Sequence, residues 1–255
     1  MLRSRIVPCL LVHRKGLVKT VNFQEPKYVG DPINAVKIFN EKEVDELLVL
    51  DIDATVEGIE PDFEMIRNLA VECRMPFCYG GGIKTVVQAM KIINLGAEKV
   101  AISSAAISNP EIIKSIGNAV GVQSVVVVLD IVKRRFFGGY EIVTHNAKKI
   151  ASVKLIDFLK TIQQIGIGEL VINSVDDDGN MTGFDFKLFD FIREQTDMPL
   201  TILGGAGTLE DIKMAIYRYK TLGVAAGSMF VFKGKYKAVL INYPTFEERK
   251  NLYQV

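Results

Sequence analysis

Short apolar runs recur along the chain, and longer amphipathic segments separate them. A short apolar run bounded by turn residues is typical of a strand buried on both faces of a parallel sheet. The pattern predicts strands at 5–12, 46–52, 76–79, 99–103, 123–130, 169–174, 199–203 and 222–226.

The intervals between these runs predict helices. Asp31 and Asn109 each precede a proline, and Thr85 and Thr208 each precede an amphipathic segment, as expected at helix starts. The predicted helices cover 31–43, 62–73, 85–95, 153–166 and 185–195, and further helices start near 109 and 208. Strands that alternate with helices through right-handed crossovers predict an α/β fold, a single (β/α)8 TIM barrel.

Two segments do not fit this alternation. Residues 13–31 are long, basic and interrupted by glycine, and we expect a mobile loop over the end of the first strand. Residues 133–149 contain a glycine pair and predict a hairpin excursion.

The fifth predicted strand ends on a carboxylate, Asp130. Because side chains alternate along a strand, Asp130 shares a face with Val126 and Val128. Catalytic groups of (β/α)8 enzymes lie at the C-terminal ends of barrel strands. An aspartate there can also cap the following turn, and the strand alone does not separate the two interpretations.

The two halves of the sequence resemble each other. DELLVLDID at 45–53 matches GELVINSVD at 168–176, and MPFCYGGGIKT at 75–85 matches MPLTILGGAGT at 198–208, with an offset of 123 in both cases. A fixed offset indicates an internal repeat. It predicts half-barrels at about 1–121 and 122–255, with two equivalent sites on one face.

Glycine pairs follow corresponding strands in the two halves. Such glycines let backbone N–H groups approach an anion, although a lone pair often marks only a tight turn. Two pairs at equal offset favour phosphate pockets. One would contain Gly81, Gly82 and Ser104, and the other Gly179, Gly204, Gly205, Gly227 and Ser228. Two pockets at one barrel mouth predict a substrate with a negative group at each end.

Composition narrows the possible functions. A net charge of +1 argues against a general nucleic-acid surface, and no apolar run is long enough to span a membrane. The N-terminus lacks the pattern of a signal peptide, so we expect a cytoplasmic protein. Cys9, Cys73 and Cys78 lack metal-binding spacing, and His13 and His145 are the two histidines. We therefore expect neither a metal nor a cofactor.

Several motifs together resemble one family along nearly the whole chain. They are RIVPCL at 5–10, KTVNF at 19–23, VGDP at 29–32, YGGGIKT at 79–85, EKVAISSAA at 98–106, VVVLD at 126–130, DDDG at 176–179, GGAG at 204–207 and AAGSMF at 225–230. In combination they resemble the cyclase subunit of imidazole glycerol phosphate synthase.

The resemblance implies a barrel that binds a glutaminase at its N-terminal end. Ammonia from glutamine would cross the barrel and attack a bisphosphorylated ribulosyl-imine, giving imidazole glycerol phosphate and an aminoimidazole carboxamide ribotide. Two aspartates act as acid and base, and a loop lysine closes over the site. Asp130 matches one aspartate, and Lys19 matches the lysine, whose alternative is a solvated loop charge. Asp178 matches a further phosphate-pocket position, and we expect Ser103 to bind phosphate beside Ser104.

The family also has a charged gate at the barrel's N-terminal end, and the matching residues are Arg5, Glu46, Lys99 and Glu169. All four stand at predicted strand starts. If they point inward, two cations and two anions would form a neutral ring, since inward charges are costly unless paired. The alternative is four separate surface charges. Glu98 and Gln123 match positions beside the glutaminase partner.

The resemblance breaks at the mouth. Leu11 stands where the family has its other catalytic aspartate, and a leucine cannot exchange a proton. Ser103 and Leu203 replace the usual Asn and Ser. With these changes the chain resembles divergent members of the family, which are second copies of the cyclase subunit found with bacterial surface-polysaccharide genes. There, ammonia would convert an acetamido sugar to an acetamidino sugar with the help of a separate sugar amidotransferase. Residues 19–47 resemble that branch.

Three functional interpretations remain open. The first is an ammonia-channelling synthase subunit, either repurposed for a phosphorylated or amino-sugar substrate, as Leu11 favours, or a true histidine-pathway cyclase. The second is a non-catalytic ammonia conduit that activates the glutaminase, against which the retained Asp130 argues. The third is an unrelated phosphate-binding barrel, which would not need charges at its N-terminal pore.

Overall fold

The computed structural model describes residues 3–134 and 138–253. Eight parallel strands form a closed barrel, in which β10 pairs with β7 to complete the ring. In order around the ring these strands are β1 (Arg5–His13), β4 (Leu47–Asp51), β5 (Phe77–Gly80), β6 (Lys99–Ile102), β7 (Val125–Lys133), β10 (Glu169–Ser174), β11 (Leu200–Leu203) and β12 (Gly223–Ala226). The predicted (β/α)8 barrel is confirmed.

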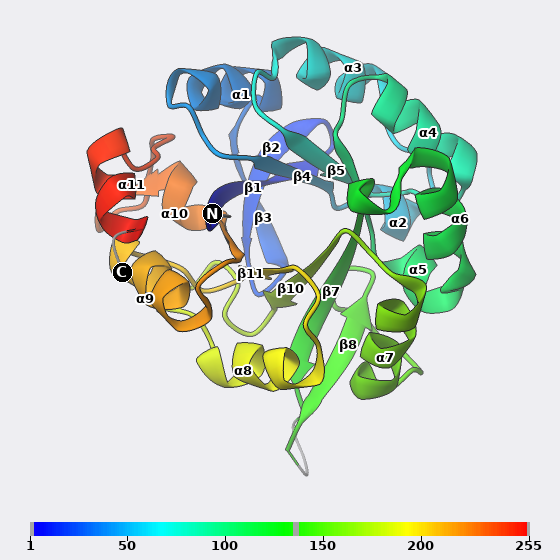
Figure 1. The fold of residues 1–255 in the computed structure, drawn as a ribbon. Coiled ribbons are helices and arrows are strands. Elements are labelled where there is room, and N and C mark those ends of the chain that lie inside the picture. Colours follow the sequence, from blue (N-terminus) through cyan, green and yellow to red (C-terminus); the bar gives the residue numbers. More distant parts are fainter. Residues whose placement is uncertain (1–2, 135–137, 254–255) are drawn as a thin grey trace.

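Helices surround the strands as an outer layer (Figure 1). They are α1 (Pro32–Glu41), α3 (Phe63–Glu72), α4 (Val86–Asn94), α6 (Glu111–Val120), α7 (Leu155–Ile165), α8 (Phe186–Gln195), α9 (Leu209–Tyr219) and α11 (Phe246–Tyr253). Thr85 and Thr208, which are equivalent in the repeat, each form a capping box at the start of a helix. The longest of these helices has 11 residues, and no helix in the described ranges is long and apolar enough to cross a membrane.

The apolar interior has two parts. The larger part lies between strands and helices and contains large buried side chains such as Phe39, Phe158 and Phe189. The smaller part fills the inside of the barrel and consists of Val7, Cys9, Leu48, Cys78, Ala101, Val126, Val128, Val171, Leu203 and Ala225. Strand alternation separates the two sets. The inner set forms an apolar column along the barrel axis.

The segment 13–31 is not the mobile loop that the sequence predicted. It forms a hairpin of β2 (Gly16–Val21) and β3 (Gln24–Gly30), and β2 pairs antiparallel with β1. The reason is that β1 continues beyond its parallel pairing with β12, so its backbone groups there need partners. The hairpin supplies them and extends the sheet over the mouth.

The hairpin excursion predicted at 133–149 is confirmed. β8 (Tyr140–Thr144) returns antiparallel to β7, with Val143 opposite Asp130, and a short β9 (Lys149–Ile150) follows. Residues 135–137 lie outside the described residues.

The sequence patterns missed the shortest elements. These are α2 (Ala54–Glu57), α5 (Ser104–Ser108), α10 (Ser228–Val231), the 3-10 turn η1 (Val122–Ser124), and the pair β13 (Phe232–Lys233) and β14 (Ala238–Val239). Each is too short to show a period. Gln123, predicted to begin a strand, therefore lies in the turn before β7.

Candidate functional site

A cavity of about 140 Å³ lies at the C-terminal mouth of the barrel. It brings together most of the mouth residues singled out by the sequence. These are Leu11, Lys19, Gly81, Gly82, Ser103, Ser104, Asp130, Asp178, Leu203, Gly227 and Ser228. Both halves of the chain contribute to its walls.

Asp130 lies at the mouth end of β7 and is partly buried. Asn173 Nδ2, from the neighbouring β10, donates to Asp130 Oδ1 at 3.1 Å. Desolvation raises the pKa of Asp130 to about 7, helped by the charge of Asp178 and opposed by the Asn173 hydrogen bond. A carboxyl group with this pKa can both donate and accept a proton near neutral pH.

Asn173 is a site residue that the sequence motifs did not identify. Its side chain is 4 % exposed, it lines the cavity, and its Oδ1 atom has no hydrogen-bond partner among the described residues. The signal that could have found it is register, because Asn173 pairs directly with Asp130 across β10 and β7.

Leucines line the mouth near Asp130. Leu11 and Leu50 pack against the inner apolar cluster, and Leu203 belongs to it and is 4 % exposed. Position 11 therefore offers no group that could share a proton with Asp130. The inner apolar cluster thus reaches the mouth at Leu11, Leu50 and Leu203.

Lys19 is buried, at 4 % exposure, so it is not a solvated loop charge. Its ammonium donates to the carbonyl of Cys9. Burial lowers the pKa of Lys19, against the opposing effects of Cys9 and Asp178. Gly227 lies directly against the Lys19 ammonium, and a β-carbon at this position would require the lysine to shift.

The hairpin that carries Lys19 is attached to the loop after β10. The backbone N–H of Asn22 donates to Asp178 O at 2.9 Å, and its side-chain Nδ2 donates to Asp176 O at 2.7 Å. Thr20 lies so close to Gly179 that no β-carbon would fit there. The hairpin is therefore closed over this side of the mouth.

The first predicted phosphate pocket opens to the cavity. Gly81 and Gly82 have φ values of 122° and 72°, a backbone conformation that favours glycine. Gly81 also approaches the carbonyl of Asp51 too closely to allow a β-carbon. Ser103 and Ser104 form the neighbouring wall.

The second predicted pocket presents a different surface. Gly227, Ser228 and Asp178 line the cavity formed by the described residues, but Gly179, Gly204 and Gly205 do not. The three glycines pack against backbone instead, as shown by the hydrogen bond from Gly183 N to Gly205 O at 2.9 Å. The two halves are thus related in sequence but are not equivalent at the mouth.

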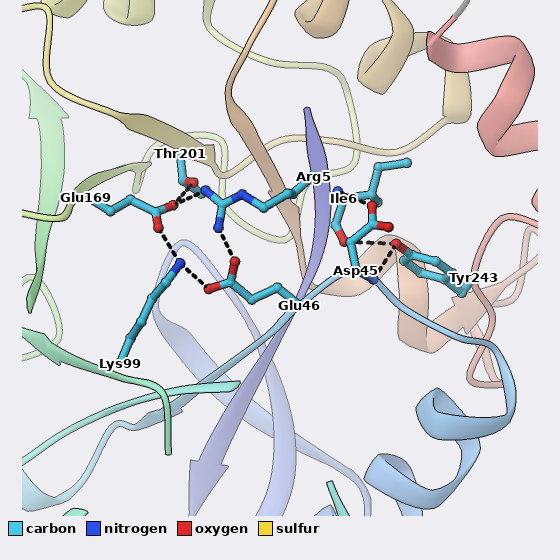
Figure 2. Close-up of polar contacts among 8 residues, drawn as sticks. All are labelled: Arg5, Ile6, Asp45, Glu46, Lys99, Glu169, Thr201 and Tyr243. Atoms are coloured by element: carbon cyan, nitrogen blue, oxygen red, sulfur yellow. Dashed lines mark hydrogen bonds and ion pairs between the residues drawn. The ribbon is translucent and has the colours of Figure 1, made fainter. Parts of the chain in front are cut away.

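The four charges at the other end of the barrel meet in one network (Figure 2). Arg5 pairs with Glu46 and, at 2.8 Å, with Glu169. Lys99 pairs with the same two carboxylates at 2.7 and 2.8 Å. Thr201, which the motifs did not single out, donates to Glu169 from the adjacent strand.

The contacts within the network favour the charged forms of Glu169 and Lys99. Glu46 and Glu169 are 5 % and 6 % exposed. Burial alone would raise the pKa of Glu169, but Arg5 and Lys99 outweigh burial and lower it. The same two carboxylates outweigh desolvation in raising the pKa of Lys99. The four side chains therefore form a neutral ring of alternating charge, which we call the charged ring.

The two predicted interface residues lie beside this ring. Glu98 directly precedes Lys99 and is exposed, and Gln123 is exposed in the turn before β7. The described residues contain no group of three or more His, Cys, Asp or Glu side chains that could hold a metal ion.

Comparison with known proteins agrees with this geometry. A family model described as histidine biosynthesis protein matches residues 5–237. A Lactococcus lactis protein named imidazole glycerol phosphate synthase subunit HisF is 35 % identical over 90 % of this chain and 89 % of its own length. This chain belongs to the HisF-like family of imidazole glycerol phosphate synthase cyclase subunits.

Other HisF-like relatives are more similar. A Vibrio vulnificus protein is 54 % identical over all of this chain and 98 % of its own length, and it is provisionally named imidazole glycerol phosphate synthase subunit hisF3. A Pseudomonas aeruginosa protein, provisionally named subunit hisF2, is 48 % identical over 96 % of this chain and 97 % of its own length.

Proposed function

We propose that this HisF-like protein is an ammonia-channelling synthase subunit. It takes ammonia from a glutaminase bound at the N-terminal face, next to Glu98 and Gln123, and releases it at a phosphate-binding mouth. We further propose that the mouth serves the amidination of an acetamido sugar in surface-polysaccharide biosynthesis rather than the ring closure of histidine synthesis.

The observation that carries the proposal is the apolar lining between the charged ring and the mouth. Beyond the ring, the inner cluster consists of aliphatic side chains and thiols and reaches Leu11 and Leu203 at the mouth. Neutral ammonia can enter such a lining at little cost, whereas a charged ammonium ion cannot. The leucine at position 11 extends the conduit and removes a proton-transfer group.

A histidine-pathway cyclase is the second candidate. Asp130 supports it, because its pKa of about 7 suits a group that exchanges protons during ring closure. The names of relatives such as the Lactococcus lactis protein support it as well. A conduit that performs no chemistry would not need a carboxyl group such as Asp130 that exchanges protons near neutral pH.

A cyclisation assay separates the candidates. The purified protein is given the bisphosphorylated imine substrate with high ammonium at alkaline pH, which bypasses any glutaminase. We expect no turnover, although phosphorylated compounds still bind. Turnover near that of a cyclase assayed in parallel would overturn the sugar proposal.

A labelling experiment tests the conduit. The protein, its glutaminase and the sugar amidotransferase receive an acetamido sugar, a nucleoside triphosphate that activates the amide oxygen as a leaving group, and glutamine labelled with ¹⁵N in the amide. We expect the label in the acetamidino product even with excess unlabelled ammonium, because the ammonia does not mix with solvent. Full dilution of the label would contradict channelling.

Leu11→Asp restores the missing carboxyl group but, we predict, not the cyclase rate, because Ser103 and Leu203 still differ from the family pattern. The matched control is Leu11→Asn, which has the same shape without the acid. A Leu11→Asp rate close to that of a cyclase would show that position 11 alone decides the chemistry.

A further inference from the structure

The turn between β8 and β9 forms one wall of the mouth. Thr144, His145 and Asn146 line the same cavity as Gly82 and Ser104. The turn follows from the hairpin, because β8 leaves the barrel beside β7 and ends at the cavity rim. It brings a side chain that can carry a positive charge to the cavity into which the first predicted phosphate pocket opens.

The turn is fixed by side-chain hydrogen bonds. Asn146 Nδ2 donates to the carbonyl of Ile52, beyond the end of β4, at 3.0 Å. His145 Nδ1 lies 3.0 Å from the hydroxyl of Thr144, which is 8 % exposed. The other ring nitrogen, Nε2, makes no hydrogen bond within the described ranges and is available to a ligand.

The backbone of the turn is unusual. His145, Asn146 and Ala147 have φ values of 54°, 56° and 60°, so three successive residues adopt the left-handed conformation without a glycine. Such conformations are uncommon outside glycine, and they cluster at functional sites, where surrounding contacts maintain them. Here the Asn146 hydrogen bond is one of those contacts.

We propose that His145 is a protonatable anion ligand of the first pocket, so that a phosphate monoester held by Gly82 and Ser104 binds more tightly when the imidazole carries a proton. The inference rests on the proposed phosphate-binding mouth and deepens it, because it makes ligand affinity depend on pH.

The charges around His145 favour this behaviour. Burial, together with Lys149 and Lys84, lowers the pKa of His145, so the imidazole is neutral at pH 7 without a ligand. A bound anion would offset the two lysines and raise that pKa. Binding would then take up a proton, and affinity would fall as the pH rises through the raised pKa.

Other charged groups line the same cavity. They are Lys19, Asp51, Asp130 and Asp178. The Asp51 carboxylate accepts the N–H groups of Asp53 and Ala54 at 2.9 and 3.1 Å, and Lys19 donates to a carbonyl. Asp130, with its pKa of about 7, becomes negative as the pH rises. Its charge would then weaken anion binding at high pH, just as the loss of the His145 proton would. The test must therefore isolate the imidazole.

Imidazole NMR isolates it, because the chain contains only two histidines, His13 and His145. His13 Nδ1 lies 2.6 Å from the Asp53 carboxylate and serves as an internal control. Inorganic sulfate is the first probe, since it does not titrate near neutral pH, and glycerol 3-phosphate is the second. We expect both to raise the pKa of His145 by about one, and sulfate therefore to bind about tenfold more tightly at low than at high pH. The ring signals of His13 should not respond to either probe.

Two variants complete the test. His145→Asn keeps a residue type that tolerates the left-handed conformation and should bind sulfate less tightly near pH 6, with a flatter pH profile. His13→Gln should behave like the parent protein. If sulfate binds with equal affinity and pH profile to the parent and to His145→Asn, the inference is overturned and the phosphate-binding mouth stands. If neither probe binds at any pH, the phosphate-binding mouth fails as well.

Discussion

Single residues at the two ends of the barrel interior differ in polarity. At the mouth, Leu11 presents apolar surface, and at the other end Lys99 and Glu169 keep charges where burial disfavours them. The leucine costs nothing to bury, whereas each buried charge depends on its partners. Position 11 could therefore change alone, but the charged ring could not.

Lys99→Met tests this dependence. The variant leaves Glu46 and Glu169 close together with Arg5 as their remaining cation. We therefore expect its free energy of unfolding, measured in urea near pH 7, to be about 3 kcal/mol lower than that of the parent protein. Lys37→Met, which removes an exposed pair with Glu72, is the control and should change stability by less than about 1 kcal/mol.

The pH dependence of this variant follows from the pKa shifts. The folded-state pKa of Glu169 is lowered, so its pairing stabilises the fold above its ordinary pKa and is lost as the pH falls through the lowered value. Lys99 has a raised pKa, so its contribution is lost only in strong alkali. The difference between Lys99→Met and the parent should narrow toward acid. If the unfolding free energies of the variant and the parent differ by the same amount at all pH values, Lys99 does not act through its pairs in the charged ring.

Among the elements, the hairpin β2–β3 differs most from the sequence-based expectation. Its residues are too mixed in polarity for a buried strand, and β3 is exposed over most of its length. What orders it is the free edge of β1 and the hydrogen bonds of Asn22 to the loop after β10. The edge of β1 becomes available only when the barrel has closed, and the loop after β10 lies about 150 residues further along the chain. No local sequence pattern could therefore predict the hairpin.

Asn22→Gly isolates the side-chain contact that closes this hairpin. Glycine retains the positive φ of 50° at this position and removes the bond to Asp176. We expect amide exchange in residues 16–30 to accelerate about fivefold, the effect of losing about 1 kcal/mol of local stability. Gln24→Ala, at an exposed position in the same hairpin, is the matched control. Unchanged exchange in Asn22→Gly would show that the backbone contacts suffice.

The barrel as a whole could be predicted from the sequence, because its strands are continuous apolar runs and its helices have start signals. The mouth residues could be listed as well, since Gly82 and Gly205 stand out in the repeat. Their unequal surroundings could not, because Gly205 packs against the backbone of Gly183, a contact that forms only in the folded chain. Asn173 and His145 also needed the fold, since register and a distant turn bring them to the cavity.

At the scale of the molecule, Asp45 joins the C-terminal helix to the barrel. It is beside Glu46 of the charged ring, and its carboxylate accepts Ile6 N at 3.0 Å and Tyr253 Oη at 2.8 Å. Tyr243 Oη donates to Ile6 O at 2.9 Å and accepts from the backbone N–H of Asp45, as Figure 2 shows. α11 is thus bound to the starts of β1 and β4.

Asp45→Asn should weaken this attachment. Arg249 is 8 % exposed and lies 3.6 Å from the Asp45 carboxylate. The substitution removes the negative charge that pairs with this buried arginine. We therefore expect the free energy of unfolding to fall by about 3 kcal/mol. Asp190→Asn is the control, because its pair with Arg218 is more exposed and should contribute about 1 kcal/mol or less. Equal losses in urea denaturation would mean that the Asp45 charge contributes no more to stability than an exposed charge does.

The length of β1 has a consequence for how such a protein can change over time. Arg5 at the ring and Leu11 at the mouth stand on one strand, six positions apart, and both face the barrel interior. Since successive side chains alternate, inserting or deleting one residue between them would turn one end outward. Substitution at either end leaves the spacing intact. A lineage can therefore exchange the chemistry of the mouth by point mutation, while the distance from the ring to the mouth is inherited unchanged.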